Sequence, residues 1–163
     1  MLQNLQNTLK EIKTLLLRDK VVRQLLYNDS NAALDMPAPD PKLVEEYLTL
    51  YPVYSFENCN QYEQNGMVNI LLTEFNVDDE KKWLSTALQI NVVFNVDRWM
   101  LLDDKIRPLA LADRIQELIN HRKFSAAVAP VLEHISDLAV NKKVVGYALL
   151  FALQDGSGEI SKF

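Results

Sequence analysis

Cysteine, glycine and histidine are scarce in this sequence of 163 residues, which contains one, four and two of them respectively. The single cysteine, Cys59, excludes an internal disulfide and a zinc site built from several thiolates. Glycine stands at about a third of its usual share, and the glycine-rich loops that hold nucleotide phosphates, GxGxxG and the P-loop, do not occur. These absences argue against a zinc protein and against a nucleotide-dependent enzyme.

Long apolar runs are also missing. None approaches the roughly 18 to 20 uncharged residues that a membrane-spanning helix needs, and the first residues lack the basic region, apolar stretch and cleavage site of a secretion signal. Hydrophobic residues make up 48% and charged residues 24%, as in soluble globular proteins. We therefore expect one domain, made in the cytoplasm and without membrane contact.

The charge balance is acidic and uneven. The chain has 17 basic and 22 acidic side chains, a net charge of −5, and residues 51–105 alone contain 4 basic and 9 acidic ones. An acidic protein is not suited to neutralising nucleic-acid phosphates as its main task, so we expect no specific nucleic-acid contact. The acidic middle and the slightly basic C-terminal part favour head-to-tail packing between copies of the chain, unless these charges form only a solvated surface.

The first segment predicts an amphipathic helix over residues 2–17. Its apolar residues repeat at spacings of three and four, which places them on one stripe that a partner surface must cover: Leu2, Leu5, Leu9, Ile12 and Leu16. The apolar period resumes beyond Asp19, so the helix either continues or breaks there before a second short helix. Residues 28–41 contain prolines at alternate positions and read as a linker. We therefore predict an N-terminal helical arm over 1–41 that docks on its own sheet or on a neighbouring subunit.

The rest of the chain predicts an antiparallel sheet crossed by a helix. A short helix should begin at Pro41, with Asp40 as its cap, and run over 42–50. Strict alternation over 88–96 predicts a strand with Asn91 and Asn95 on its solvent side, which pairs with a strand over 67–75 through a loop at 76–86.

Helical periodicity returns over 106–121, with Pro108 in the first turn and Asp103 or Asp104 as the cap. Two further strands, 128–140 and 143–154, follow with a tight turn between them. The predicted fold class is α+β, a four-stranded antiparallel sheet with one helix packed across it, over residues 42–155. A flexible tail, 156–163, should end the chain.

Several residues resemble those of a known group of proteins. They are Trp99, Leu102-Asp103-Asp104, Ile106-Arg107-Pro108, the helix 110–116 and Gly146-Tyr147. In this pattern, from about residue 10 to residue 153, the chain resembles small virion proteins of tailed bacteriophages. Its order of helices and strands is similar to that of tail terminators and tail-completion proteins, which form rings at the neck between head and tail. The resemblance implies a structural virion protein, made in the host cytoplasm, that forms a homo-oligomeric ring and contacts neck, portal or tail proteins.

The candidate site is therefore a hypothetical subunit interface, with no catalytic, cofactor-binding or metal-binding residue predicted. Its members are Arg107, Asp103, Asp104, Trp99, Leu5, Leu9 and Ile12. Other interpretations stay open, because the two aspartates could serve only as a helix cap and Arg107 could pair with them inside the chain. The histidines, His121 and His134, read as structural. The alternative function is a small soluble adaptor that binds one partner through its N-terminal amphipathic helix.

Overall fold

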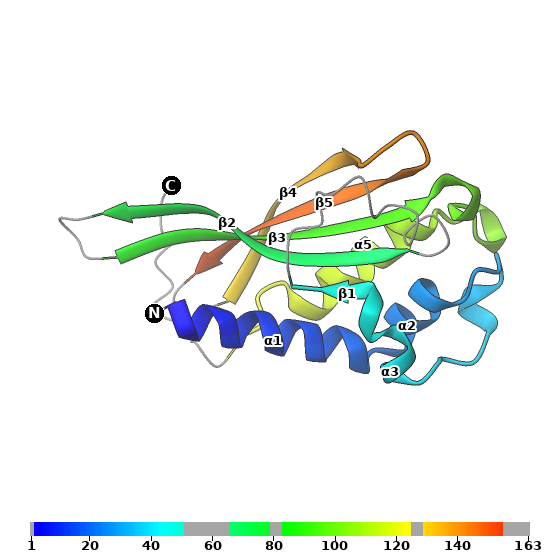
Figure 1. The fold of residues 1–163 in the computed structure, drawn as a ribbon, viewed down its shortest axis with the longest axis horizontal. Coiled ribbons are helices and arrows are strands. Elements are labelled where there is room, and N and C mark those ends of the chain that lie inside the picture. Colours follow the sequence, from blue (N-terminus) through cyan, green and yellow to red (C-terminus); the bar gives the residue numbers. More distant parts are fainter. Residues whose placement is uncertain (1, 51–65, 79–82, 125–128, 155–163) are drawn as a thin grey trace.

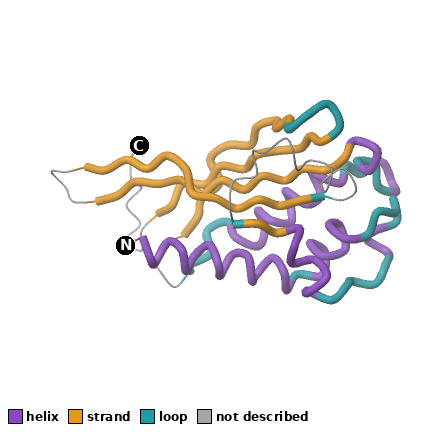
Figure 2. Tube along the Cα trace, viewed as in Figure 1, coloured by secondary structure: helices purple, strands orange, loops and turns teal. Residues whose placement is uncertain are grey.

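The computed structural model describes residues 2–50, 66–78, 83–124 and 129–154, and it shows helices packed on one face of a single sheet (Figures 1 and 2). The helices are α1 (Leu2–Arg18), α2 (Lys20–Tyr27), α3 (Pro41–Val44) and α5 (Arg107–Ile119). The strands are β1 (Leu48–Thr49), β2 (Met67–Asp78), β3 (Trp83–Asn95), β4 (Ala129–Ala139) and β5 (Val144–Gln154). The predicted α+β class is confirmed.

The sheet has five strands in the order β1-β2-β3-β5-β4, and β1 runs parallel to β2 while the other neighbours are antiparallel. The prediction of four antiparallel strands is therefore wrong by one strand. Asp40 caps α3 as expected, but this helix ends at Val44, and a 3-10 turn leads into β1. Leu48 is 1% exposed and aligns with Val68, so burial against the sheet overrides the helical pattern at this point.

The N-terminal helices share the core of the sheet. The helix is interrupted at Asp19, between α1 and α2, so the predicted alternative of two separate helices is the correct one. Buried apolar side chains of α1 and α2 belong to the same cluster as those of β2, β3, β5 and α5. The core is therefore continuous across the proline-rich segment. The N-terminal arm docks on the sheet of its own chain, which is one of the two predicted options. Residues 156–163, the predicted tail, lie outside the described residues.

The β2–β3 hairpin is confirmed and is longer than predicted. Its paired positions run from Met67 with Val93 out to Asp78 with Trp83, with an irregularity between Thr73 and Asn76. The loop predicted at 76–86 is wrong, because both strands continue through most of it. The pairing of β3 with β5 begins only at Ala87, so the hairpin extends beyond the rest of the sheet as a two-stranded ribbon (Figure 1).

The second hairpin, β4–β5, matches the prediction within about two residues at each end. The side-chain carbonyl of Asn141 accepts hydrogen bonds from the backbone N–H groups of Lys143 and Val144 and so holds the tight turn. Gly146 faces the backbone of β3 so closely that a Cβ there would lie 1.8 Å from the carbonyl oxygen of Val92. Only glycine fits at this position of β5.

Candidate functional site

Arg107, the first residue of α5, is 1% exposed and tied to four backbone carbonyls. Its Nε donates to the carbonyl of Arg98 at 2.8 Å and its Nη1 to that of Leu25 at 3.0 Å. Further hydrogen bonds reach the carbonyls of Asn28 and Ser30. One guanidinium thus fastens the end of α2 and the segment after it to the start of α5.

Burying the charge of Arg107 costs free energy, and these hydrogen bonds compensate for that cost. The guanidinium also lies over the Phe94 ring, 5.9 Å from its centroid. Burial, with a smaller contribution from repulsion by Arg98, lowers the pKa of Arg107 to about 10, so the group is still charged at neutral pH. Arg107 therefore stabilises the fold of its own chain. We retain neither the predicted ion pair between Arg107 and Asp103 or Asp104 nor the predicted place of Arg107 in a subunit interface.

Asp103 and Asp104 form an exposed turn just before α5. Both have positive φ angles, 60° and 56°, in a conformation that aspartate tolerates better than most residues. The capping prediction is wrong, because the cap position of α5 is Ile106 and no side chain there bonds the helix end. A backbone bridge between Met100 and Ile106 closes the base of the turn. The turn is therefore available for contact with another molecule.

Apolar side chains surround this turn. Met100 and Leu102 are 53% and 46% exposed. Trp99 is half-buried, contacts the core and packs beside Tyr147, with 6.2 Å between ring centroids. Its indole N–H is buried without a hydrogen-bond partner in the part of the chain that the structure describes. Trp99 thus supports the turn from the core side, while Met100 and Leu102 flank it at the surface.

The three predicted interface residues of α1 lie against the chain's own core. Ile12 is 0% and Leu5 is 7% exposed, and Leu9 is partly buried against the same cluster. The apolar stripe of α1 is therefore occupied within one copy. Ile12 cannot contact another subunit. Of the predicted interface residues, Asp103 and Asp104 remain candidates for a contact between subunits.

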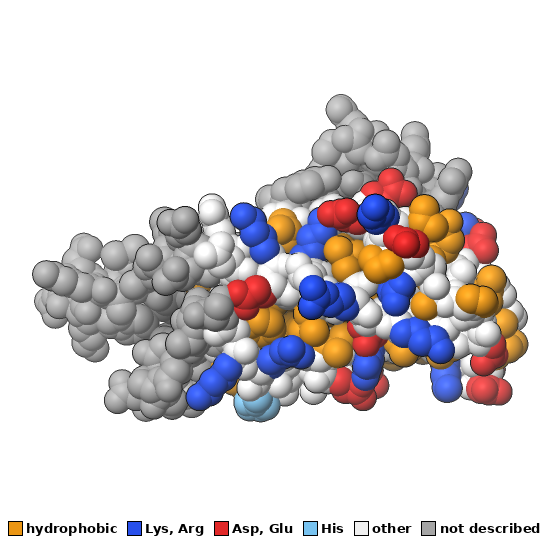
Figure 3. Space-filling view, turned by 90° about the horizontal axis from the view of Figure 1, so that it is seen from below, with side chains coloured by type: hydrophobic (Ala, Val, Ile, Leu, Met, Phe, Trp, Pro, Cys, Tyr) orange, Lys and Arg blue, Asp and Glu red, His pale blue; other side chains and the backbone are white. Residues whose placement is uncertain are grey.

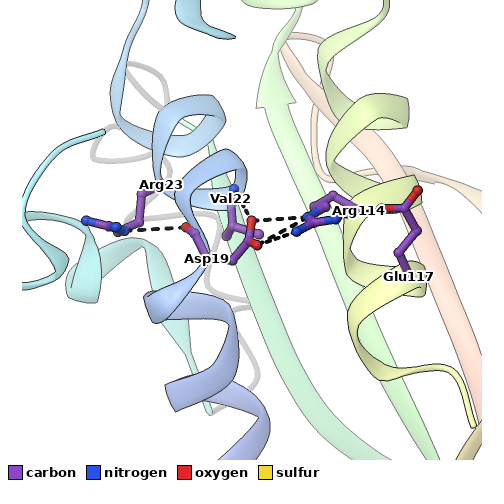
Figure 4. Close-up of polar contacts among 5 residues, drawn as sticks. All are labelled: Asp19, Val22, Arg23, Arg114 and Glu117. Atoms are coloured by element: carbon purple, nitrogen blue, oxygen red, sulfur yellow. Dashed lines mark hydrogen bonds and ion pairs between the residues drawn. The ribbon is translucent and has the colours of Figure 1, made fainter. Parts of the chain in front are cut away.

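Sequence reasoning missed an ion pair that joins α2 to α5 (Figure 4). Asp19 caps α2 by accepting from the N–H of Val22 at 3.0 Å, and it also accepts from Nη2 of Arg114 at 2.7 Å. Burial alone would raise the pKa of Asp19, but the hydrogen bonds from Arg114 and Val22 outweigh it and lower the pKa. The hydrogen bonds that Arg114 donates to Asp19 and Glu117 raise the pKa of Arg114. In the sequence, the only sign of this ion pair is the place of Asp19 at the point where the apolar period of the first helix is interrupted.

A polar ladder crosses the other face of the sheet, where the sequence predicts solvent. Asn91 and Asn95 are 6% and 7% exposed, so their assignment to a solvent side is wrong. The Nδ2 of Asn69 donates to Thr49 at 2.9 Å, and the Nδ2 of Asn91 donates to the side-chain carbonyl of Asn69 at 3.3 Å. Gln89 extends the ladder by donating to Asn91 at 2.8 Å. These hydrogen bonds link three neighbouring strands.

The remaining candidates show no catalytic arrangement among the described residues. His121 follows α5 with a φ of 59°, and His134 is exposed on β4. Cys59 lies outside the described residues. Within the described ranges, no group of three or more histidine, cysteine and acidic residues is placed to hold a metal ion. The helices described there include none with the length and apolar character to cross a membrane.

Comparisons with known proteins bear on the family rather than on a site. Neither the curated proteins nor the solved structures contain a match to this chain. The model of one family, described as YomW, matches residues 19–153, from the cap of α2 to the penultimate residue of β5. Since this match covers well over half of the sequence, the chain belongs to the YomW family, whose name is of the phage type.

Proposed function

We propose that this protein is a structural virion protein of a tailed phage that assembles into an oligomeric ring at the neck between head and tail, as a tail terminator or a tail-completion protein. It is not an enzyme in this proposal, and its partners are further copies of itself and the neighbouring neck, portal or tail proteins. The phage-type family name and the order of helices and strands both favour it.

The observation that carries the proposal is the ribbon formed by Asn76–Asp78 and Trp83–Thr86. Among the described residues, no third strand accompanies this part of the hairpin, because β5 pairs with β3 only from Ala87 onward. A two-stranded ribbon is marginally stable in water by itself and needs a further surface to lie on. A neighbouring subunit supplies that surface in a ring.

The alternative is an adaptor that binds a partner through its N-terminal amphipathic helix. It would need the apolar stripe of α1 as its docking surface. The apolar stripe of α1 is packed into the core of the same copy, with Ile12 and Leu16 fully buried. To bind a partner through that stripe, the protein would have to expose its own core. We therefore do not retain the adaptor as a second candidate.

Light scattering on the full-length chain tests the proposal. We expect a particle several times heavier than the 18.7 kDa chain, and antibody labelling of phage particles should place the protein at the neck. Replacing residues 75–85 by Asn-Gly should preserve a folded body and abolish the ring, since it removes the projecting ribbon. A monomer at every concentration, together with particles that carry no label at the neck, would refute the proposal.

A further inference from the structure

A basic hollow lies between α1 and the segment that follows α5. It has a volume of about 370 Å³ and is lined by Lys10, Glu11, Thr14, Leu15, Arg18, Arg122, Lys123 and Phe124. Four of these side chains are cationic and one is acidic, in a chain whose net charge is −5. The hollow therefore has the opposite sign to the protein as a whole.

The four cations of the hollow have no acidic partner among the described residues, although Arg18 stands in the last turn of α1, where a cation is favourable. Other basic residues do form ion pairs, such as Lys13 with Glu45 and Arg114 with Asp19. In the described parts of the chain, the side chains of Lys10, Arg18, Arg122 and Lys123 form no ion pair, and all four are exposed. The face of the molecule seen in Figure 3 displays many lysine and arginine side chains among apolar ones. Unpaired cations around one concave surface are suited to an acidic partner.

The acidic turn and the basic hollow lie at opposite ends of α5. Asp103 and Asp104 precede the helix, whereas Arg122 and Lys123 follow it. A helix of 13 residues spans about 20 Å at 1.5 Å per residue, so the turn of one copy does not reach its own hollow. Two complementary surfaces at opposite ends of this helix allow a head-to-tail contact between copies, which forms a closed ring when the rotation from one copy to the next closes.

We propose that the basic hollow of one copy receives the Asp103–Asp104 turn of the next copy. This inference rests on the proposed function, since it identifies the contact that builds the ring. Both surfaces also have an apolar part, because Met100 and Leu102 flank the turn and the half-buried Leu15 lines the hollow beside the largely buried Phe124. Charge complementarity at such a contact favours the head-to-tail arrangement over pairing of like surfaces, which would bring like charges together.

Charge reversal in the full-length chain tests the contact. The Arg122→Glu/Lys123→Glu double variant should raise the concentration for half-assembly at least tenfold and leave the thermal midpoint unchanged, because both side chains are exposed. A matched control, Lys142→Glu/Lys143→Glu, changes the charge equally at the exposed β4–β5 turn and should assemble normally. Adding Asp103→Lys and Asp104→Lys to the first variant should restore part of the assembly, since the two surfaces then exchange signs while lysine fits the positive φ angles less well than aspartate.

A zero-length carbodiimide cross-link between a carboxylate and a lysine amine provides a direct readout. In a mixture of light and ¹⁵N-labelled chains, Asp103 or Asp104 should join to Lys10 or Lys123 in peptides that contain one light and one heavy part. Such products prove a contact between copies, since their light and heavy parts come from different chains. Their absence from an assembled sample would overturn the inference.

Two results separate this inference from the proposed function. Rings that survive the Arg122→Glu/Lys123→Glu change, without the cross-link, would overturn the contact and leave the ring standing. A wild-type chain that never assembles and is absent from the neck would remove both. Double-stranded DNA provides the remaining comparison, because salt-dependent binding that is lost in the reversed variant, while assembly persists, would assign the hollow to phosphates and overturn the contact.

Discussion

Asp104 and Arg107 are three residues apart, yet one projects into solvent and the other is among the most deeply buried side chains of the protein. The sequence groups them as one charged corner. In the structure, Arg107 turns inward because four backbone carbonyls meet where α2 ends and α5 begins. The two aspartates are exposed, in a turn of positive φ angles whose base the Met100–Ile106 bridge closes.

This difference separates stability from assembly at one corner of the molecule. A buried charge that satisfies several backbone acceptors stabilises the fold, and its removal leaves those acceptors unpaired. An exposed charge contributes little to the fold and remains available for a partner. Substitutions at these residues therefore test which side chains stabilise the fold and which take part in assembly.

The largest effect is expected for Arg107→Met. The variant keeps much of the apolar stem but leaves the carbonyls of Arg98, Leu25, Asn28 and Ser30 without their donor. We expect the free energy of unfolding to fall by at least about 3 kcal/mol, measured by urea denaturation at pH 7. Lys105→Met, an exposed control from the same corner, should change it by less than about 0.5 kcal/mol. Equal effects of the two substitutions would contradict the structural role of Arg107.

The next effect concerns Asn91, where burial of a polar group is tested on the sheet. Asn91→Asp keeps the shape of the side chain but turns the Nδ2 donor into an oxygen that faces the side-chain oxygen of Asn69. We expect a loss of about 2 kcal/mol at pH 7 in thermal or urea denaturation. Ser136→Ala, at an exposed position of β4, serves as the control and should be nearly neutral. A neutral Asn91→Asp would restore the interpretation that this side of β3 faces solvent.

A smaller effect is expected for Asp19→Ala, which removes both the cap of α2 and the partner of Arg114. The loss should be about 1 to 2 kcal/mol at neutral pH. Because the folded-state pKa of Asp19 is lowered, its stabilisation is present above the ordinary value of 3.8 and is lost as pH falls through the folded-state pKa. The difference between wild type and variant should therefore shrink below about pH 4.

Asp40→Ala is the matched control for Asp19, since Asp40 caps the four-residue α3. It should cost less than Asp19→Ala in the same denaturation experiment. If the two variants lost the same stability at neutral pH, the bond to Arg114 would add nothing to the cap.

Much of the fold could be predicted from the sequence where a local pattern decides the structure. Alternation predicts the β2–β3 pairing, Pro108 predicts the start of α5, and Asp40 predicts the cap of α3. These signals depend on near neighbours in the chain. The failures arise where distant segments decide, as at Leu48, which becomes a strand because β2 provides a partner.

The candidate site was less predictable for the same reason. Charge patterns identify Asp103, Asp104 and Arg107 as unusual but do not tell which of them is buried. Three of the four carbonyls that bind Arg107 come from residues about 80 positions earlier. The basic hollow combines residues of α1 with residues that follow α5. No spacing rule within one segment brings Lys10 and Lys123 together, so only the folded chain reveals that surface.

The smallest effect on stability, and the clearest separation of the two roles, is expected for Asp104→Asn. Asparagine tolerates the positive φ of 56° as aspartate does, so the change removes one charge and preserves the backbone. The free energy of unfolding should stay within about 0.5 kcal/mol, because the side chain is exposed and asparagine caps a helix as well as aspartate does. Assembly measured by light scattering should nevertheless weaken, because the carboxylate is lost from every subunit contact of a ring. A variant that assembles like the wild type would remove the Asp104 carboxylate from the proposed subunit contact.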